Sequence, residues 1–319
     1  TLVQMHYLDI EYAIDKSGCL YLLQVRPLII KNTKEEYSDN YFFSELKKSQ
    51  KKFNKIAAMK KGLAGNKTAL GNMTDWNPAE MIGNRPKELS YSLYKKLITD
   101  KVWAQAREKA GYKKIKNHKL MHSISGHPYI DIRVCFNSFL PSKLNKNISN
   151  KLIDFYISKL EINPELHDKV EFEVIPTCID FNFIKYEKLF LKANFNQNEI
   201  NLYKIKLKKI TNNLILQKSV NIKNELDNLY FLESFRKKQL KKIIKKDAPF
   251  QLKKLISYTI KFGTLTFSKL ARNGFIAISF LNSMLDRKII SKIELEKILE
   301  SIPTIASDFT EKVRILKNK

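Results

Sequence analysis

The sequence predicts an α+β fold that is mainly helical, with one β-hairpin at the N-terminus followed by a largely helical region. Residues 9–14 and 20–27 alternate apolar and polar side chains with a period of two, as half-buried strands do. Beyond residue 147, most apolar residues repeat with the helical period instead. With 319 residues, 44% of them hydrophobic, the chain can build one large domain or two ordinary domains.

The first element is the hairpin, whose turn is predicted at residues 15–18, where Asp, Lys, Ser and Gly supply turn chemistry. A four-residue loop places Asp9 opposite Gln24 and Glu11 opposite Leu22. Opposed residues share a face of the sheet, and alternate positions stay on it. The polar face therefore consists of Asp9, Glu11, Gln24 and Arg26. The apolar face, which we expect to point into a core, consists of Ile10, Tyr12, Leu23 and Val25.

The polar face of the hairpin has two interpretations. Carboxylates beside an amide and an arginine suit a metal–polyphosphate ligand, because Mg²⁺ takes hard oxygen ligands and arginine meets phosphate oxygens with a planar fork of donors. The same residues also fit a surface hairpin with an ion pair between Arg26 and Glu11. The residue pattern alone favours the surface hairpin, since short hairpins with mixed charges are common.

A resemblance to a known family favours the ligand site. The strands DIEYA and LYLLQVRP resemble the closing hairpin of the ATP-grasp nucleotide-binding domain in the phosphoenolpyruvate synthase and pyruvate phosphate dikinase family, which includes rifampin phosphotransferases. The resemblance implies that Glu11 is a metal ligand of the Mg-nucleotide and that Gln24 and Arg26 contact the nucleotide. It assigns no firm role to Asp9. ATP and Mg²⁺ are the cofactors that it implies.

The resembled enzymes split ATP, pass a phosphoryl group to a histidine on a swivelling domain, and deliver it to an acceptor at a separate site. This sequence has no Gly-rich loop with a lysine before the hairpin, and no small-residue run around a histidine. We therefore expect a fragment, inactive alone, whose ATP-grasp N-lobe and phosphohistidine domain belong to the same polypeptide. Its expected partner is a small-molecule phosphoryl acceptor.

The resemblance and the composition divide the chain into three parts. Residues 1–31 would end the ATP-grasp domain, and residues 32–71 would form a linker of helix and loop. Residues 72–319 would form a mostly helical central domain that binds the acceptor, because the corresponding region of rifampin phosphotransferases holds it.

The sequence TDWNPAEMIGNRP at residues 74–86 opens the central domain. Asn77 can cap a short helix, and Pro78 fits its first turn. The block resembles a segment just past the ATP-grasp domain in a branch of uncharacterised phosphoenolpyruvate-utilising proteins. Three other residues of the block fit capping and packing as well as they fit ligand binding: Asp75, Trp76 and Arg85.

Two further segments contain candidate residues. Residues 125–134 are predicted to be extended, with Tyr129, Asp131 and Arg133 on one face. His127 in this segment is expected in a loop or at a ligand, and the proline after it argues against a phosphohistidine. The sequence GTLTFSKLAR, which ends at Arg272, resembles the same family branch. Arg272 fits an anionic substrate and an ion pair equally well.

Helical periodicity predicts the remaining elements. Helices are expected from about residue 90, over about 199–218 and 223–246, and as a buried apolar pair within 252–285. Residues 170–176 alternate like a strand instead. A final helix begins at Ser291 with a capping box and is expected to bury four residues: Leu295, Ile298, Leu299 and Ile302.

Composition argues against several classes of protein. The three cysteines lack the spacing of a disulfide framework or a zinc site. No apolar run approaches the roughly 18 residues of a membrane span, so we expect a cytoplasmic protein without a membrane partner.

The formal net charge of +26 suggests nucleic-acid binding, because lysine-rich surfaces bind phosphate backbones. The lysines are spread along the chain, however, and their densest run has the spacing of a solvated helix face, so we do not expect a nucleic-acid partner. Two alternatives to the phosphotransferase stay open. One is a non-catalytic basic helical protein that binds nucleic acid or an acidic partner, and the other is a helical interaction scaffold.

Overall fold

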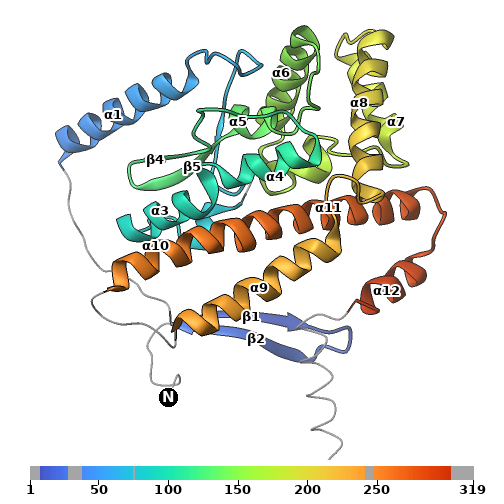
Figure 1. Cartoon of the computed structure of the whole chain (residues 1–319). Helices are drawn as coiled ribbons and strands as arrows, with labels where there is room; N and C mark the ends of the chain where they lie inside the picture. The colour runs from blue at the N-terminus through green and yellow to red at the C-terminus, as the bar shows by residue number, and fades with distance from the viewer. Residues whose placement is uncertain (1–7, 28–37, 75, 241–246, 303–319) are drawn as a thin grey trace, which may run out of the picture. The chain divides into compact units, whose positions relative to one another are not determined.

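The computed structural model describes residues 8–27, 38–74, 76–240 and 247–302. The chain separates into two compact units, Thr1–Lys48 and Ser49–Lys319. The described residues are mainly helical and begin with an antiparallel hairpin (Figure 1). This confirms the predicted α+β class with a helical majority.

The first unit contains the hairpin, formed by β1 (Leu8–Ile14) and β2 (Leu20–Pro27). Ile14 pairs with Leu20, so the loop has five residues, one more than expected. A one-residue change in the loop shifts the register and would move the side chains of one strand to the opposite face.

The predicted pairing is therefore wrong, although the polar face still forms. A β-bulge directly after Glu11 shifts the register by one more residue in the same direction as the longer loop. Glu11 consequently pairs with Gln24 instead of Leu22. Asp9 pairs with Arg26. The loop and the bulge together displace the pairing by two residues, and a displacement of two keeps each side chain on its face. The four polar residues therefore lie together as expected.

The apolar face of the hairpin does not point into a core as expected. Ile10, Tyr12 and Leu23 are all exposed, and Val25 is half-buried. Two strands cannot bury a face by themselves, because burial needs a further layer of structure. The described residues of the first unit provide no such layer.

The second unit contains a small antiparallel sheet of order β3–β5–β4, formed by β3 (Leu70–Gly71), β4 (Met121–Ile124) and β5 (His127–Asp131). The extended segment predicted at 125–134 therefore ends at Asp131. There α5 (Ile132–Asn137) begins, and the side chain of Asp131 caps it. Capping explains the early end of the strand, since Asp favours the position before a helix.

Helices make up most of the rest of the second unit (Figure 1). They are α1 (Asp39–Ala57), which begins in the first unit, and α2 (Pro78–Ile82), α3 (Glu88–Tyr94), α4 (Val102–Ala110), α6 (Lys146–Ile162), α7 (Phe183–Lys192) and α8 (Gln197–Ile215). The predicted cap at Asn77 and the predicted helices near residue 90 and over about 199–218 are confirmed. Tyr94 and Ile98 are buried in the core.

Aromatic residues of α5, α6 and α8 fill the centre of the core. Phe136 meets Tyr156 edge-on, with ring centroids 6.3 Å apart. The hydroxyl of Tyr156 donates to that of Tyr203 at 3.2 Å, and Tyr203 donates to a backbone carbonyl at 3.1 Å. These bonds satisfy phenols that are fully buried, which is the usual condition for burying tyrosine.

The strand predicted at 170–176 is wrong. Val170–Val174 is one turn of π-helix, which follows a 3₁₀ turn at Pro164–Asp168. Val170 and Val174 are both buried, but Phe172, the middle apolar residue of the alternating pattern, is exposed. A short apolar run fits a helical turn as well as a strand, and only its neighbours in space decide between them.

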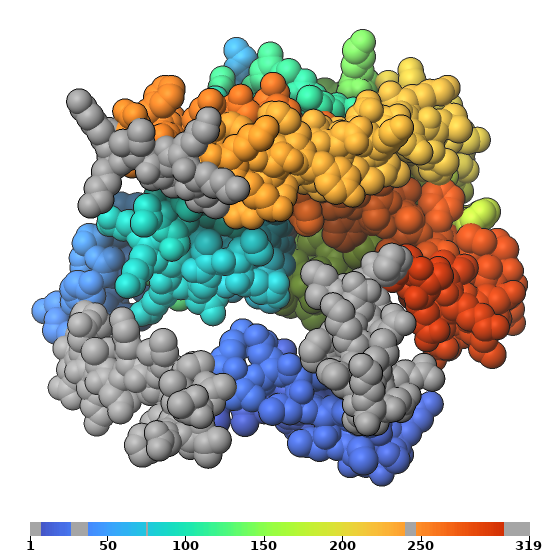
Figure 2. All heavy atoms as spheres, turned by 60° about the horizontal axis from the view of Figure 1, so that its bottom comes forward, coloured from blue at the N-terminus to red at the C-terminus, as the bar shows by residue number. Residues whose placement is uncertain are grey.

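Four helices end the described chain: α9 (Ile222–Leu240), α10 (Ala248–Tyr258), α11 (Leu265–Asp286) and α12 (Lys292–Glu300). A π-helical segment, Thr259–Thr264, joins α10 to α11. The space-filling view shows α9 alongside α11 (Figure 2). The helix predicted at 223–246 is confirmed as far as Leu240, and its last residues lie outside the described part.

The expected apolar burial of this region is wrong. Residues buried on α11 are mostly polar: Thr266, Lys269, Arg272 and Ser283, with Ile276. Two of them are satisfied by α9, because Glu225 accepts hydrogen bonds from Thr266 at 2.9 Å and from Lys269. On α12 the predicted capping box is present, but Ile298 and Leu299 are exposed and Leu295 is half-buried. Ile302, which follows the helix, is exposed as well.

Candidate functional site

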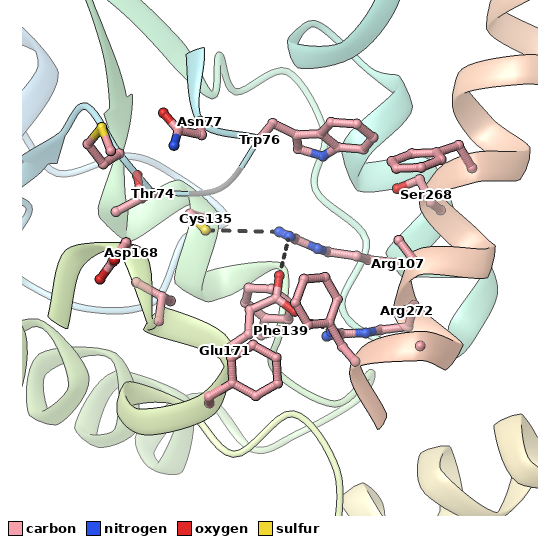
Figure 3. A pocket seen from close by; sticks show the side chains of 18 of the residues that line it. Thr74, Trp76, Asn77, Arg107, Cys135, Phe139, Asp168, Glu171, Ser268 and Arg272 are labelled. Atoms are coloured by element: carbon pink, nitrogen blue, oxygen red, sulfur yellow. Dashed lines mark hydrogen bonds and ion pairs between the residues drawn. The ribbon is translucent and has the colours of Figure 1, made fainter. Parts of the chain in front are cut away.

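A cavity of about 820 Å³ lies within the second unit (Figure 3). Its walls come from α2 and the loop before it, from α4, α5 and α11, and from the turns at 164–174. Two of the sequence blocks singled out above, 74–86 and 263–272, therefore meet at one cavity. The volume lies within the range of small-molecule sites, about 300–1,000 Å³.

Two arginines and one glutamate form the polar side of the cavity. Arg107 on α4 and Arg272 on α11 are both buried, and both reach Glu171 on the π-helical turn. Nη2 of Arg107 lies 3.4 Å from Oε1 of Glu171, while Nη2 of Arg272 donates to Oε2. Figure 3 shows the three side chains converging from separate elements. Deep in the site, two cations thus share one anion.

Further contacts hold the arginines in place. Nη1 of Arg107 donates to the hydroxyl of Ser138 at 2.6 Å. Its guanidinium lies 3.7 Å from the centroid of Phe139, and the guanidinium of Arg272 lies 5.5 Å from the same ring. The ring faces attract both cations. The two guanidinium groups are therefore pre-oriented.

Arg272 is held in its charged form. Burial by itself lowers the pKa of Arg272, but the adjacent Glu171 carboxylate and the phenol of Tyr112 outweigh it and raise the pKa above its ordinary value. A charged group in a low-dielectric site acts strongly on an ion that enters it.

Several buried polar atoms at the cavity have unused hydrogen-bonding capacity. Nε and Nη1 of Arg272 and the hydroxyl of Thr74 have no hydrogen-bond partner among the described residues. Both residues line the cavity. Buried polar groups in proteins are nearly always paired, so these unpaired donors are candidate contacts for a bound molecule or an ordered water.

Aromatic side chains form the apolar walls. Trp76 and Phe267 lie with ring centroids 5.8 Å apart and planes tilted by 52°. The hydroxyl of Tyr94 donates to the backbone carbonyl of Trp76 and holds this segment. Trp76 and Asn77 have φ of 60° and 28°, a region that non-glycine residues rarely adopt. Such strain gathers at functional sites, where the surrounding structure enforces it.

The remaining candidate residues of the second unit do not join the cavity. Nε of Arg85 donates to Nε2 of His127 at 3.0 Å, and neither residue lines the cavity. Asp131 is a structural acceptor, bound by Lys60 at 3.0 Å and by Thr68 at 2.7 Å.

Two candidates remain. Arg133 donates to the backbone carbonyls of Ile56 and Ala58 at 3.1 and 2.8 Å, which ties α1 to α5. Asp75 lies outside the described residues.

The sequence analysis missed Arg107 and Glu171. A usable signal for Arg107 was its position on the apolar face of VWAQAREKA, where a charge needs a buried partner. No feature of the sequence indicated this role for Glu171, because residues 170–174 alternate like a strand and place Glu171 on its polar face.

The hairpin in the first unit presents a more open set of polar groups. Nη2 of Arg26 lies 2.7 Å from Oε1 of Glu11 and 3.2 Å from Oδ2 of Asp9. All three side chains are about half exposed, and Gln24 pairs with Glu11 in the sheet.

The donor types of the hairpin fit one edge of a Mg-nucleotide site, with carboxylates for the metal and a guanidinium and an amide for phosphate. No group of three or more His, Cys, Asp or Glu that could hold a metal occurs within the described residues.

None of the described helices is long and apolar enough to cross a membrane. No family model and no curated protein matches the chain, and no solved structure matches it.

Proposed function

We propose that this chain is part of an ATP-dependent phosphotransferase of the phosphoenolpyruvate synthase type. The hairpin would contribute to the Mg-ATP site, and the cavity would bind a small-molecule phosphoryl acceptor. One observation carries the proposal. The blocks 74–86 and 263–272, which resemble one family branch but lie far apart in the sequence, form neighbouring walls of one cavity.

In the hairpin, Glu11 would hold the metal, while Gln24 and Arg26 would contact the nucleotide. Mg-ATP would supply the phosphoryl group and neutralise part of its charge. Without a ligand, Arg26 pairs with Glu11 and keeps both side chains on the polar face. Exposed ion pairs are worth about 0–1 kcal/mol, so exchanging this pair for metal and phosphate contacts costs little.

In the cavity, the chain's own residues would bind and orient the acceptor. The rings of Trp76 and Phe267 would contact the apolar part of the acceptor, and the arginines would fix one end of the molecule. Such positioning provides much of the catalysis in phosphoryl transfer, because little covalent chemistry falls to the protein. We place this activity in the cytoplasm, where ATP is available.

Phosphorylation of the full-length gene product by labelled ATP tests the proposal. Glu11→Ala and Arg26→Ala should each abolish acid-labile labelling of the protein while circular dichroism stays unchanged. Lys16→Ala is the matched control, since Lys16 is exposed in the turn of the same hairpin. Undiminished labelling in either site variant, or none in the wild type, would contradict the proposal.

A further inference from the structure

The geometry points to the chemical class of molecule that the cavity binds: a small organic monoanion with a flat apolar body. Its carboxylate or sulfonate would lie at Arg272, and its body would contact Trp76 and Phe267. The inference rests on the proposed function in treating the cavity as the acceptor site. The ligand class itself follows from the cavity walls.

The anionic end follows from the unpaired donors. Glu171 occupies Nη2 of Arg272 and leaves Nε and Nη1 without an acceptor among the described residues. An oxyanion with several acceptor oxygens can satisfy them, and charge-assisted bonds to arginine are the stronger kind. Neutral ligands would leave part of this charge unmatched.

A single negative charge follows from the charges around the cavity. The buried side of the cavity has a net charge of +1, because it contains the guanidinium groups of Arg107 and Arg272 and the carboxylate of Glu171. Two further lining carboxylates, Glu80 and Asp168, are exposed. They disfavour molecules with several negative charges, because like charges repel. The cavity is therefore unsuited to a nucleotide or a polyphosphate.

The flat body follows from the apolar walls. Besides Trp76 and Phe267, the rings of Phe139, Phe172 and Phe275 line the cavity. Aromatic rings favour offset or edge-on contact with a flat partner. The hydroxyl of Thr74, which Figure 3 shows on the other side of the cavity from Arg272, offers a hydrogen bond to a polar substituent away from the anionic end.

Two fluorescent probes test the ligand class. 8-Anilinonaphthalene-1-sulfonate is an aromatic monoanion, and N-phenyl-1-naphthylamine has the same rings without the sulfonate. Both are titrated into the full chain at physiological salt, since a net charge of +26 attracts any anion when screening is weak. We expect one sulfonate probe to bind per chain, about tenfold or more tighter than the neutral probe.

Arg272→Gln should weaken binding of the sulfonate probe about tenfold and leave the neutral probe unchanged. Arg236→Gln is the matched control, because Arg236 is exposed on α9 and does not line the cavity. Glu171→Gln should tighten binding of the sulfonate probe, since it removes the anion that competes for both arginines. Loss of folding would expose apolar surface and raise the binding of both probes, so tighter binding of the sulfonate probe counts only where circular dichroism and the neutral probe are unchanged.

The inference is overturned if the neutral probe binds as tightly as the sulfonate, if Arg272→Gln has no effect, or if Arg236→Gln weakens binding as much. Where Arg272→Gln does not fold, Arg272→Lys replaces it. Lysine keeps the charge beside Glu171 but loses the planar fork, so unchanged affinity in that variant also overturns the inference. Protein labelling by ATP tests the hairpin separately, so either proposal can fail without the other.

Discussion

The hairpin and the cavity use the same pair of side chains in opposite environments. Arg26 and Glu11 have side chains that are 52% and 54% exposed, whereas Arg272 and Glu171 are 6% and 17% exposed. Water screens the first pair, so it contributes little to stability, and under the proposed function it would exchange for a ligand at little cost. Breaking the second pair leaves an uncompensated buried charge, so it stays in place and orients its surroundings.

The largest effect that would test this comparison is expected at the buried carboxylate. Glu171→Gln leaves two buried arginines without their anion, and we expect a loss of about 3 kcal/mol or more in the free energy of unfolding. Urea unfolding measures it. Glu233→Gln, which breaks an exposed ion pair on α9, is the control and should change stability by less than about 1 kcal/mol. Equal losses in the two variants would remove the distinction between buried and exposed pairs.

The reactivity of the three cysteine thiols should also differ between the exposed hairpin and the buried surroundings of the cavity. Cys19 is exposed at the hairpin loop, whereas Cys135 at the cavity and Cys178 are buried. Burial raises the pKa of Cys178 to about 12, so its thiol stays protonated at pH 8. Iodoacetamide should alkylate Cys19 at least about tenfold faster than the other two, because they react only after local opening. Mass spectrometry over time measures the rates, and comparable rates would show that the cavity opens freely.

A smaller effect is expected at the exposed pair. Arg26→Ala should change the free energy of unfolding by less than about 1 kcal/mol, because solvent screens both of its ion pairs. The same urea experiment measures it. A loss as large as that expected for Glu171→Gln would mean that the hairpin pair is structural and not available for exchange.

The smallest effect concerns the pH dependence of the hairpin turn. Hydrogen bonds from Ser17, Cys19 and Tyr21 lower the pKa of Asp15 below its ordinary value of 3.8. A lowered pKa in the folded state means that the contribution to stability is present above pH 3.8 and is lost as pH falls through the folded pKa. An NMR titration of the Asp15 carboxyl should find its midpoint below that of a model peptide. A midpoint at or above 3.8 would contradict the turn geometry.

The hairpin shows how far sequence reasoning reaches. Alternation correctly predicted two strands and the polar face of Glu11, Gln24 and Arg26. It predicted the wrong register, because the five-residue loop and the bulge after Glu11 each shift the pairing by one residue in the same direction, two residues in all. The alternation of apolar and polar residues encodes neither the loop length nor the bulge. The polar face was predicted correctly because a total shift of two residues does not change which face a side chain occupies.

The cavity shows where sequence reasoning stops. The motif blocks supplied Trp76 and Arg272 as candidates, each with an alternative structural role. They could not supply Glu171, whose segment alternates like a strand but folds as a π-helical turn. Arg107, Glu171 and Arg272 come from three elements that are distant in sequence, and their meeting depends on how α4 and α11 pack.

The sequence by itself determined the local features of this protein: the cap at Asn77, the capping box from Ser291 to Glu294, and most of the helices. Each depends on hydrogen bonds or periodicity within a few residues, so local chemistry suffices. Only the tertiary structure decided the hairpin register, the turn at 170–174, the polar burial on α11 and the two arginines that share one carboxylate. Those features depend on long-range contacts, because a buried charge is stable only where the fold brings its partner.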